Sequence, residues 1–527
     1  MGKALEKLWK TEDWWAVWLG LGLMVLALLT YAFGATIKGW AVTPGKWANL
    51  SQLGADFSKH IGGVAVVFLV FGVVFTISMK IMGRKLSEFI PGYIILFVGS
   101  LIVFYLAGWE VMKRYDLGAP LLALIIGLII GNIIKVPEWF KTSLRTEYYI
   151  KTGIVLLGAT LPLTLIFSAG PIAFVQATIV AVTTWLVIFI VATKLFKLDP
   201  RFGAVLGAGG AVCGVSASIA VGGSVRADKD HIAIGIGVVS IWAIVMIFTL
   251  TFVCKAMVPH TITPGEAGAW VGTSEFADAA GFAVVAELAT KFGDSPINTF
   301  TLMKVIGRDI WIGIWCLILS VVSVMFWERN AEGDRQTVGA GVIWERFPKF
   351  VLGFFAASVI MSVVSAAPPS GHMGVAKVDG TFSSKAGKAK YSADFSTYAV
   401  PEALANKFQY QADKGTITFA GGMSIKEFNL LRGAATTESQ RWALTQLRYK
   451  SDWYESELNP KVIAPIKKLR SWAFVLCFLC IGLSTRFAEL AHFGLKPFWA
   501  FTIGVLVNVP LGYFLSTVVF SGYWSKI

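Results

Sequence analysis

A series of long apolar runs constrains this chain more than any other feature of its sequence. Many of these runs exceed the ~20 residues that a helix needs to cross a bilayer. Of the 527 residues, 56% are hydrophobic and only 15% are charged, whereas soluble domains are about half apolar and about a quarter charged. Because backbone groups inside a bilayer must be hydrogen-bonded within the protein, such runs fold as helices. The sequence therefore predicts an all-α, polytopic membrane protein.

Hydropathy predicts about eleven spans. The first is too long for the apolar core of a signal peptide, so we expect it to remain as an uncleaved span. Two further segments, 202–224 and 268–290, are apolar but rich in Gly, Ser and Thr. The expected spans are 14–34, 61–82, 90–108, 118–135, 149–168, 171–195, 231–257, 302–327, 343–367, 471–489 and 497–520.

The distribution of Lys and Arg predicts the orientation of these spans. The net charge is +14, which in a soluble protein would favour nucleic acid as a partner. Here much of the positive charge lies in short loops, as is typical of cytoplasmic loops, so no nucleic-acid partner is expected. The alternation places the N-terminus in the cytoplasm and residues 368–465 in the periplasm or outside the cell. Lys113 and Arg114 run against this pattern. The expected location is the inner (plasma) membrane.

The polar stretch 368–465 predicts a small α+β insertion outside the membrane. Its first half alternates, as in KVDGTFSS and GTITFAGG, which is typical of short strands. Residues 438–454 have the pattern of an amphipathic helix with mixed charges. A lid or spacer is favoured over a partner-binding role. The predicted units are 1–84 with the N-terminal spans, 85–367 with the main transmembrane region, 368–465, and 466–527 with the C-terminal spans.

The cysteines give no sign of a metal site or a disulfide framework. All five lie in or beside apolar segments, and none has metal-ligand spacing with a His. We therefore expect no metal and no cofactor. The five are Cys213, Cys254, Cys316, Cys477 and Cys480.

The first interrupted segment, within 201–231, mixes apolar residues with residues that loosen a helix. A Gly inside a helix costs up to about 1 kcal/mol relative to Ala. One interpretation is an unwound or re-entrant helix at a substrate site, because opened backbone in a bilayer must be satisfied by protein, water or ligand. Close helix packing through small residues is the other, and the segment alone favours neither. Its candidate substrate-binding residues are Gly209, Gly210, Gly214, Ser216 and Ser218.

The second interrupted segment, 268–290, adds carboxylates to a similar composition. Glu275 and Asp278 are three residues apart and therefore share one face of a helix. A carboxylate at membrane depth is costly and points to function, so this pair is the candidate site for a coupling H⁺ or Na⁺. The alternative is a position in water at the interface. Thr273 and Ser274 precede the pair and are candidate substrate contacts.

Lys304 and Arg308 begin the next span and lie four residues apart on one helix face. They could attract an anion, or they could balance Glu275 and Asp278. A pair of long side chains that extend to the headgroup level is an equally good interpretation. Glu287 is interpreted as marking a helix end.

Four stretches together resemble the sulfate exporter family of bacterial membrane proteins. They are TGIVLLGATL at 152–161, GAGGAVCGVSASIA at 207–220, GAWVGTSEFADAAGFAVVAEL at 268–288 and GLSTRFAELAHFGLKPF at 482–498. The Cys-Gly pair of the second stretch and the C-terminal stretch are the most specific. The resemblance covers residues 85–366 and 471–520.

This resemblance implies a place in the superfamily of cation:proton antiporters and anion transporters. Their fold has inverted repeats, a panel, a core and two broken helices that cross near mid-membrane. The segments 202–224 and 268–290 fall where broken helices are expected. Many members carry a His with an acidic neighbour in the second segment, whereas this chain has SEFAD at 274–278 and no His there. The implied substrates are sulfate or small sulfonate-like anions.

The leading hypothesis is a secondary active transporter that moves a small anion, coupled to H⁺ or Na⁺, by alternating access around the two broken helices. A Na⁺/H⁺ antiporter of the same fold is one alternative. A membrane sensor or scaffold that uses 368–465 is another. An enzyme is not expected, because the sequence has no HExxH, GxSxG or paired membrane aspartates. The bilayer is an expected partner, and homodimer formation stays open.

Overall fold

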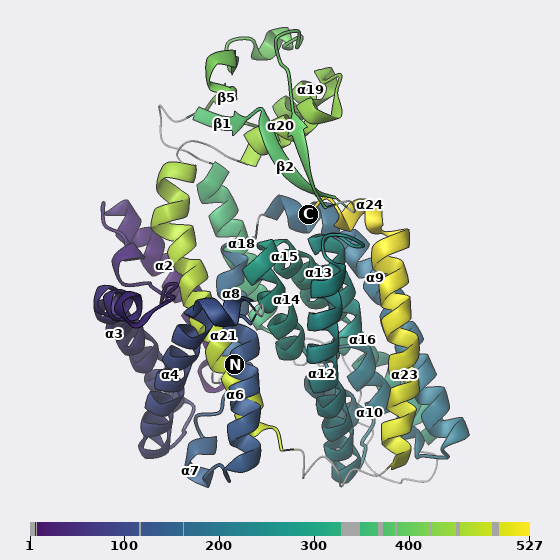
Figure 1. The fold of residues 1–527 in the computed structure, drawn as a ribbon. Coiled ribbons are helices and arrows are strands. Elements are labelled where there is room, and N and C mark those ends of the chain that lie inside the picture. The colour runs from purple at the N-terminus through teal and green to yellow at the C-terminus, as the bar shows by residue number, and fades with distance from the viewer. Residues whose placement is uncertain are drawn as a thin grey trace.

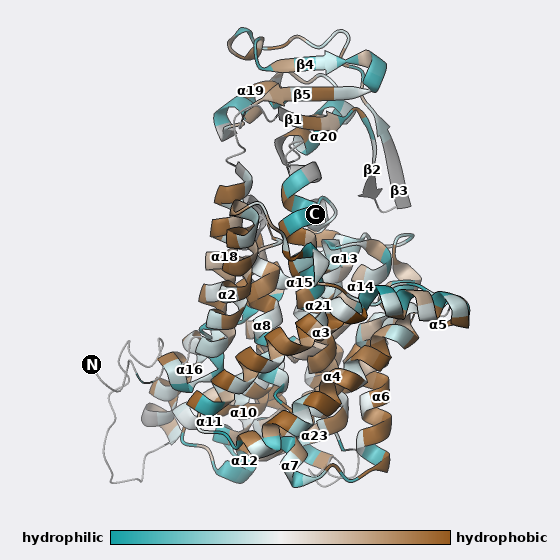
Figure 2. Ribbon diagram, turned by 90° about the vertical axis from the view of Figure 1, so that its left-hand side faces the viewer, coloured by the Kyte–Doolittle hydropathy of each residue, from teal (hydrophilic) through white to brown (hydrophobic). Residues whose placement is uncertain are grey.

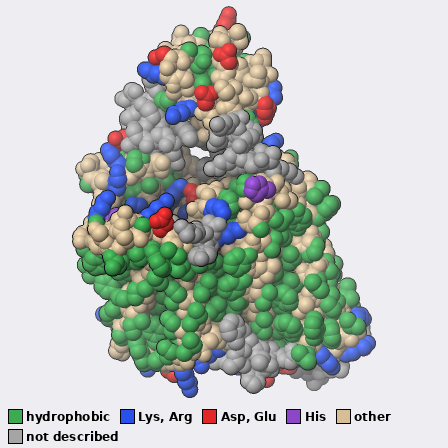
Figure 3. Space-filling model, in the orientation of Figure 1, with side chains coloured by type: hydrophobic (Ala, Val, Ile, Leu, Met, Phe, Trp, Pro, Cys, Tyr) green, Lys and Arg blue, Asp and Glu red, His purple; other side chains and the backbone are tan. Residues whose placement is uncertain are grey.

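The computed structural model describes residues 6, 8–114, 117–161, 163–327, 348–366, 373–384, 387–421, 423–449, 454–486 and 495–527. Seven helices within these ranges are long and apolar enough to cross a membrane. On the face turned to the viewer, Figure 3 shows a broad band of hydrophobic side chains, with charged side chains above and below it. The chain is therefore a multi-pass membrane protein. The seven helices are Glu12–Ala32, Leu50–Ile81, Leu86–Gly108, Gly170–Leu195, Lys229–Met257, Ser295–Trp327 and Leu495–Val519.

Four of the predicted spans are helices that are shorter or more highly charged. The span predicted at 149–168 needs the clearest correction, because the structure divides it. Helix α8 (Thr146–Gly158) ends before the run is complete, and α9 (Leu163–Ile190) begins shortly after it. The other three are α6 (Ala119–Ile133), α18 (Phe350–Ala366) and α21 (Ala464–Ser484).

The helices form two bundles that lie side by side (Figure 1). In the first bundle α21 packs against α6 and α8, and α2 packs against α8 and α18. Its interior is apolar and aromatic, and the rings of Trp472 and Phe97 stack with centroids 4.5 Å apart. The first bundle comprises α2 (Glu12–Ala32), α3 (Leu50–Ile81), α4 (Leu86–Gly108), α6, α8, α18 and α21, with the short elements η1 (Ile37–Gly39), α5 (Glu110–Arg114), α7 (Glu138–Lys141) and η7 (Tyr454–Ile463).

The second bundle contains both interrupted segments, and α9 packs against several of its members. Local capping explains where two of its helices begin. The Asp199 side chain accepts from backbone N–H groups at the start of α10, and Thr263 and Glu266 form a capping box at the start of α13. The bundle comprises α9 with η2 (Val191–Leu195), α10 (Pro200–Ala211), α11 (Val215–Ser224), α12 (Lys229–Met257), α13 (Pro264–Ser274), α14 (Asp278–Phe292), α15 (Ser295–Thr301) with η3 (Leu302–Arg308), α16 (Trp311–Val322) with η4 (Ser323–Trp327), α23 (Leu495–Phe514) with η8 (Leu515–Val519), and α24 (Ser521–Trp524).

The first interrupted segment folds as a hairpin of two antiparallel helices, α10 and α11, which we call the first hairpin. Ser218 Oγ donates to the Val205 carbonyl at 3.4 Å. Arg201, at the start of α10, donates from Nη1 to the carbonyl of Arg226, just beyond α11, at 3.3 Å. Both ends of the hairpin therefore lie at the same side of the bundle. The turn uses Gly214 at φ +74°, a left-handed conformation that suits Gly.

The second interrupted segment is also a hairpin, formed by α13 and α14, which we call the second hairpin. Helix α14 ends at Phe292, directly before α15 begins. At the start of α13, a Cβ placed on Gly265 would lie 3.4 Å from Oγ of Ser295, the first residue of α15. The beginning of α13 and the end of α14 therefore lie together, at one side of the bundle.

The two hairpins approach from opposite ends of the second bundle and meet at their turns, which are residues 212–214 and 275–277. Helix α10 lies toward the lower end in Figures 1 and 2, and α13 lies toward the end that carries the β-strands. A Cβ placed on Gly214 would lie 2.8 Å from the Phe276 carbonyl oxygen. The resemblance implied broken helices that cross near mid-membrane, whereas the residues alone left a crossing or a re-entrant segment open. In the structure each segment turns back on itself.

Residues 373–449 form the predicted α+β insertion, apart from the helix bundles (Figure 2). Strands β1 (Met373–Lys377), β5 (Thr416–Ala420) and β4 (Phe408–Gln411) form an antiparallel sheet in that order. Strands β2 (Asp379–Ser384) and β3 (Gly387–Ser392) pair separately. Short η5 (Glu402–Leu404) and η6 (Ala412–Lys414) connect strands. Helix α20 (Glu438–Tyr449) packs against β1 and β5, and α19 (Ile425–Ala434) packs against α20. The amphipathic helix predicted over 438–454 is α20, and 450–453 lie outside the described residues.

Candidate functional site

Lys304 lies where the two hairpin turns meet. It belongs to η3, a π-helical stretch, and its side chain is fully buried. Its Nζ donates to the Val212 carbonyl of the first turn at 2.7 Å and to the Glu275 carbonyl of the second turn at 2.8 Å. A single ammonium group therefore joins the two hairpins.

Arg308 makes the same connection with its buried guanidinium group. Toward the first hairpin, Nε donates to the Ala211 carbonyl and Nη2 to the Gly210 carbonyl, each at 3.0 Å. Toward the second hairpin, Nη1 donates to three carbonyls, those of Thr273 (2.8 Å), Gly272 (3.1 Å) and Glu275 (3.1 Å).

These contacts explain why two cations are buried here. The last carbonyls of a helix have no partner within it, and they carry partial negative charge. Both α10 and α13 end inside the bundle, so Lys304 and Arg308 supply the missing donors. Intramembrane cations are costly unless they are paired or bound to carbonyls. The interpretation that this pair extends to the headgroups is wrong, while attraction of an anion stays a prediction.

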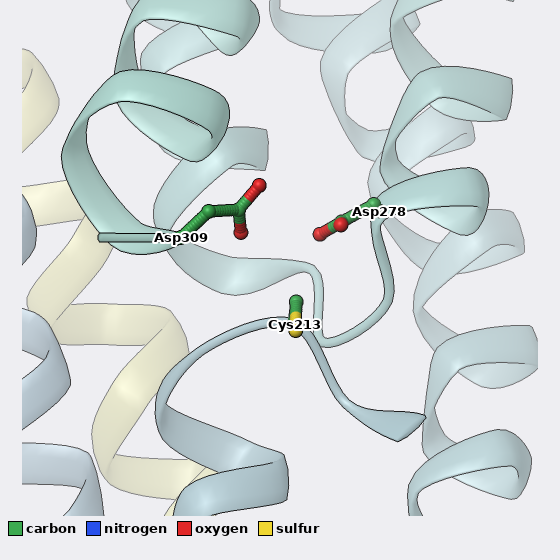
Figure 4. Close-up of side chains that lie close together, drawn as sticks. All are labelled: Cys213, Asp278 and Asp309. Carbon is green, nitrogen blue, oxygen red and sulfur yellow. The ribbon is translucent and has the colours of Figure 1, made fainter. Parts of the chain in front are cut away.

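Asp309 and Asp278 point toward each other across the junction, with Cys213 between and below them (Figure 4). Their ligand atoms and the Cys213 thiol all lie within 4.8 Å of one another. Neither carboxylate oxygen of Asp309 has a hydrogen-bond partner within the described part of the chain. Asp278 Oδ1 lies 3.7 Å from Lys304 Nζ. Two carboxylates this close favour a shared cation between them.

Glu275 does not join this pair, although the sequence grouped it with Asp278. Its Oε1 accepts from the backbone N–H groups of Phe276 at 2.9 Å and Ala277 at 3.4 Å, so its carboxylate caps the second turn. Its Oε2 has no hydrogen-bond partner among the described residues. Asp309 is the functional candidate that the sequence reasoning missed. Its signal was a carboxylate directly after a Lys and Arg pair in an apolar span.

The predicted glycine contacts serve packing as much as the site. A Cβ on Gly209 would lie 2.6 Å from Ser218 Oγ, and a Cβ on Gly210 would overlap Ile188. Ser218 is fully buried and holds α10 to α11. Two of the candidate glycines reach the junction: the Gly210 carbonyl accepts from Arg308, and Gly214 lies in the first turn, against the Phe276 carbonyl. The first segment therefore combines the two interpretations, a re-entrant segment and close helix packing through small residues.

The predicted hydroxyls occupy three different environments. Ser216 is partly exposed beside the first turn. Thr273 Oγ1 donates to the Trp270 carbonyl at 2.8 Å, inside its own helix. Ser274 is buried, and its Oγ has no partner among the residues that the structure describes. Ser216 and Ser274 are therefore the hydroxyls still available to a ligand.

The junction is closed toward the insertion and partly open elsewhere. Val215, Ser216, Ala277 and Asp278 are partly exposed, while residues 279–288 of α14 are all buried. Of the two carboxylates, Asp278 is partly exposed and Asp309 is buried.

Glu287 links the two bundles at the closed end. It is fully buried, and Oε1 accepts from the backbone N–H of Gly118, the N-cap of α6, at 2.7 Å. The same oxygen pairs with Lys255 Nζ at 2.7 Å. An anion at a helix N-terminus is stabilised by the free N–H groups and the helix dipole. Glu287 thus holds the second hairpin against α6 of the first bundle, a role that its interpretation as a helix end did not include.

Comparisons with known proteins identify relatives across much of the chain. A family model described as conserved hypothetical protein 698 matches residues 91–380. A UPF0324 membrane protein of Nitrosomonas europaea is 30% identical over 416 residues, which are 70% of this chain and 85% of that protein. A UPF0324 membrane protein of Rhodopirellula baltica is 31% identical over 339 residues, 63% of this chain and 60% of that protein.

One further relative and one solved structure complete the comparison. A UPF0324 membrane protein of Nitratidesulfovibrio vulgaris is 28% identical over 472 residues, 88% of this chain and 65% of that protein. This chain thus spans less than two thirds of the Rhodopirellula and Nitratidesulfovibrio relatives. A sodium proton antiporter from Methanocaldococcus jannaschii is 11% identical with a TM-score of 0.17, over 75% of this chain and 100% of that chain. That score is too low to bear on fold or function.

Proposed function

This chain belongs to the membrane protein family described as conserved hypothetical protein 698, and we propose that it is a secondary active transporter of small ions in the cytoplasmic membrane. One observation carries the proposal. Asp278 and Asp309 face each other in a buried junction of two helical hairpins, and Asp309 has no protein partner in the described chain. Intramembrane carboxylates of this kind mark ion pathways and proton relays.

The hairpins also place helix ends and non-helical backbone at the junction, where they can contact an ion. Non-helical backbone at membrane depth persists only where protein buries it or where it lines a cavity. In many transporters, short helices end near mid-membrane and direct their termini at ions. Here the turns at 212–214 and 275–277 meet inside the bundle, and Lys304 satisfies carbonyls of both. We place the coupling cation, H⁺ or Na⁺, between Asp278 and Asp309.

A small anion, such as sulfate or a sulfonate, is the proposed cargo. The starts of α11 and α14 face the junction, and helix N-termini offer free N–H groups and positive dipole ends to anions. The hydroxyl of Ser216 lies at the start of α11 and would add a polar contact. Ser274 ends α13, and its hydroxyl faces Gly512 of α23. Lys304 lies 3.7 Å from Asp278, so cation binding at that carboxylate would alter the field that an anion meets.

Alternating access would move the second bundle against the first. In the arrangement described here, Glu287 fastens α14 to α6 at the closed end, while Asp278 is partly exposed. Breaking the Glu287 contact would open the junction toward the insertion. Exchange of Na⁺ for H⁺ without an anion is the second candidate function, because the facing carboxylates alone would support it.

Flux through proteoliposomes tests the proposal. An imposed H⁺ or Na⁺ gradient should drive uptake of labelled sulfate or sulfonate, and Asp309→Asn should abolish it. Asp230→Asn, an exposed carboxylate at the start of α12, is the matched control and should transport normally. Cation exchange without any anion requirement would favour the second candidate. No gradient-driven flux of any ion would overturn the proposal.

A further inference from the structure

We propose that the hairpin junction also binds a thiophilic divalent cation of the Zn²⁺ and Cd²⁺ class, through Cys213, Asp278 and Asp309. The ligand atoms of these three side chains lie within 4.8 Å of one another. They come from the first turn, the first residue of α14 and the residue that follows η3 (Figure 4). The site uses two side chains of the proposed transport site but does not depend on transport.

The environment of Asp309 is independent evidence for a ligand at this cluster. Its side chain is 1% exposed, it points into the cluster, and both of its oxygens lack a partner in the described residues. A buried carboxylate in proteins is normally paired, hydrogen-bonded or bound to a metal. Lys304 and Arg308 leave it unsatisfied, because their donors are directed at backbone carbonyls.

The donor set selects a soft or borderline cation. A thiolate with two carboxylates suits Zn²⁺ and its thiophilic analogues. Three protein ligands with one open position are typical of zinc sites that exchange water or substrate. Mg²⁺ and Ca²⁺ need six or more oxygens. The carbonyls that would supply them at the turns are already bound by Lys304 and Arg308.

Charge balance supports the same assignment. Metal binding converts the Cys213 thiol to a thiolate and releases one proton to solvent. The thiolate, Asp278 and Asp309 then carry three negative charges. A divalent cation and the Lys304 ammonium group, 3.7 Å from Asp278, carry three positive charges. The buried Arg308 and Glu275 side chains add one charge of each sign and leave this balance unchanged.

The test is Cd²⁺ binding to the purified full-length protein in detergent after treatment with a chelator. We expect one Cd²⁺ per chain and an ultraviolet thiolate-to-metal charge-transfer band. Cys213→Ser should abolish the band, and Asp309→Asn should weaken binding about tenfold or more. Cys254→Ser, a buried cysteine in α12, is the matched control and should keep both signals.

Several outcomes would overturn the metal site. They are a band that survives in Cys213→Ser, Cd²⁺ affinity that is unchanged in Asp309→Asn, or equal binding of Mg²⁺. Circular dichroism and elution volume identify a misfolded variant. If Asp309→Asn is misfolded, Asp278→Asn replaces it and should likewise weaken Cd²⁺ binding about tenfold or more. Because no flux is measured, this site can fail while transport stands, and transport can fail while Cd²⁺ binds.

Discussion

The two hairpins have the same shape but opposite chemistry. Between Arg201 and Arg226 the first hairpin has no charged side chain, and it offers backbone carbonyls and a thiol to the junction. The second hairpin carries Glu275 in its turn, Asp278 at the start of α14 and Glu287 near the end of α14. Two hairpins with similar backbones thus differ in charge through the side chains at and after one turn.

Some contacts are common to both hairpins, and one belongs to the second hairpin alone. Lys304 and Arg308 bind carbonyls of both hairpins, so their loss should affect both. Glu287 fastens only the second hairpin to the first bundle. If the second bundle moves against the first as proposed, the Glu287 contact of the second hairpin would therefore change, while the contacts of Lys304 and Arg308 lie within the moving bundle.

Loss of Arg308, which contacts both hairpins, should have the largest effect on stability. Arg308→Ala removes the donors of five carbonyls and should destabilise the protein by about 3–5 kcal/mol, as breaking buried polar pairs does. Thermal unfolding in detergent measures it. Lys229→Ala, an exposed cation at the start of α12, is the control. Equal midpoints for the two variants would contradict the shared role.

A change at the first turn should have the next largest effect. Gly214→Ala must hold a Cβ at φ +74° and 2.8 Å from the Phe276 carbonyl oxygen, at a cost of about 2–4 kcal/mol. Gly34→Ala has φ +77° and no described atom within 4 Å of its Cβ, so it should cost only about 1–2 kcal/mol. If both variants lose the same stability, the contact between the turns is unimportant.

Glu287→Gln should have a smaller effect on stability and a specific effect on access. Losing charge-assisted hydrogen bonds to Gly118 and Lys255 should cost about 1.5–3 kcal/mol. In a Ser216→Cys background, thiol labelling from the insertion side should increase. The exposed Glu138→Gln is the control. Unchanged labelling would mean that Glu287 does not hold the junction closed.

Removing the insertion should have the smallest effect on transport. Its strands and helices have their own hydrophobic core, which includes Ile417, Leu431 and Leu444. A short linker in place of 373–449 should therefore leave flux within about twofold of the full chain, or about 0.4 kcal/mol in barrier height. Proteoliposome flux measures it. Loss of flux would give the insertion a role in the transport cycle.

Much of this fold could be predicted from the sequence, because its apolar runs and small-residue segments have direct physical meanings. Both hairpins were located as interrupted segments, since Gly-rich helices can approach closely. Their reversal of direction could not be predicted, because an interrupted apolar run of that length fits a crossing and a hairpin alike. The run at 149–168 was likewise predicted as one span, because its apolar composition does not show that α8 ends and α9 begins within it.

The site was predicted less completely. Asp278 and the Lys304–Arg308 pair were recognised because charge in an apolar run is conspicuous. Asp309 and Glu287 gain their significance from partners on other helices, which are Asp278 for the one and α6 for the other. A single sequence does not place those helices side by side. Glu275 was grouped with Asp278 by helical spacing, but α13 ends at Ser274 and breaks that spacing.

The most direct test of the central claim is a double-mutant cycle on cation-driven flux with Asp278→Asn and Asp309→Asn. If one coupling cation is shared by both carboxylates, each single variant should abolish coupling. The double variant should then lose nothing more, since interacting residues are not additive. Full coupling in either single variant, or independent losses that add in the double variant, would contradict a shared site between Asp278 and Asp309.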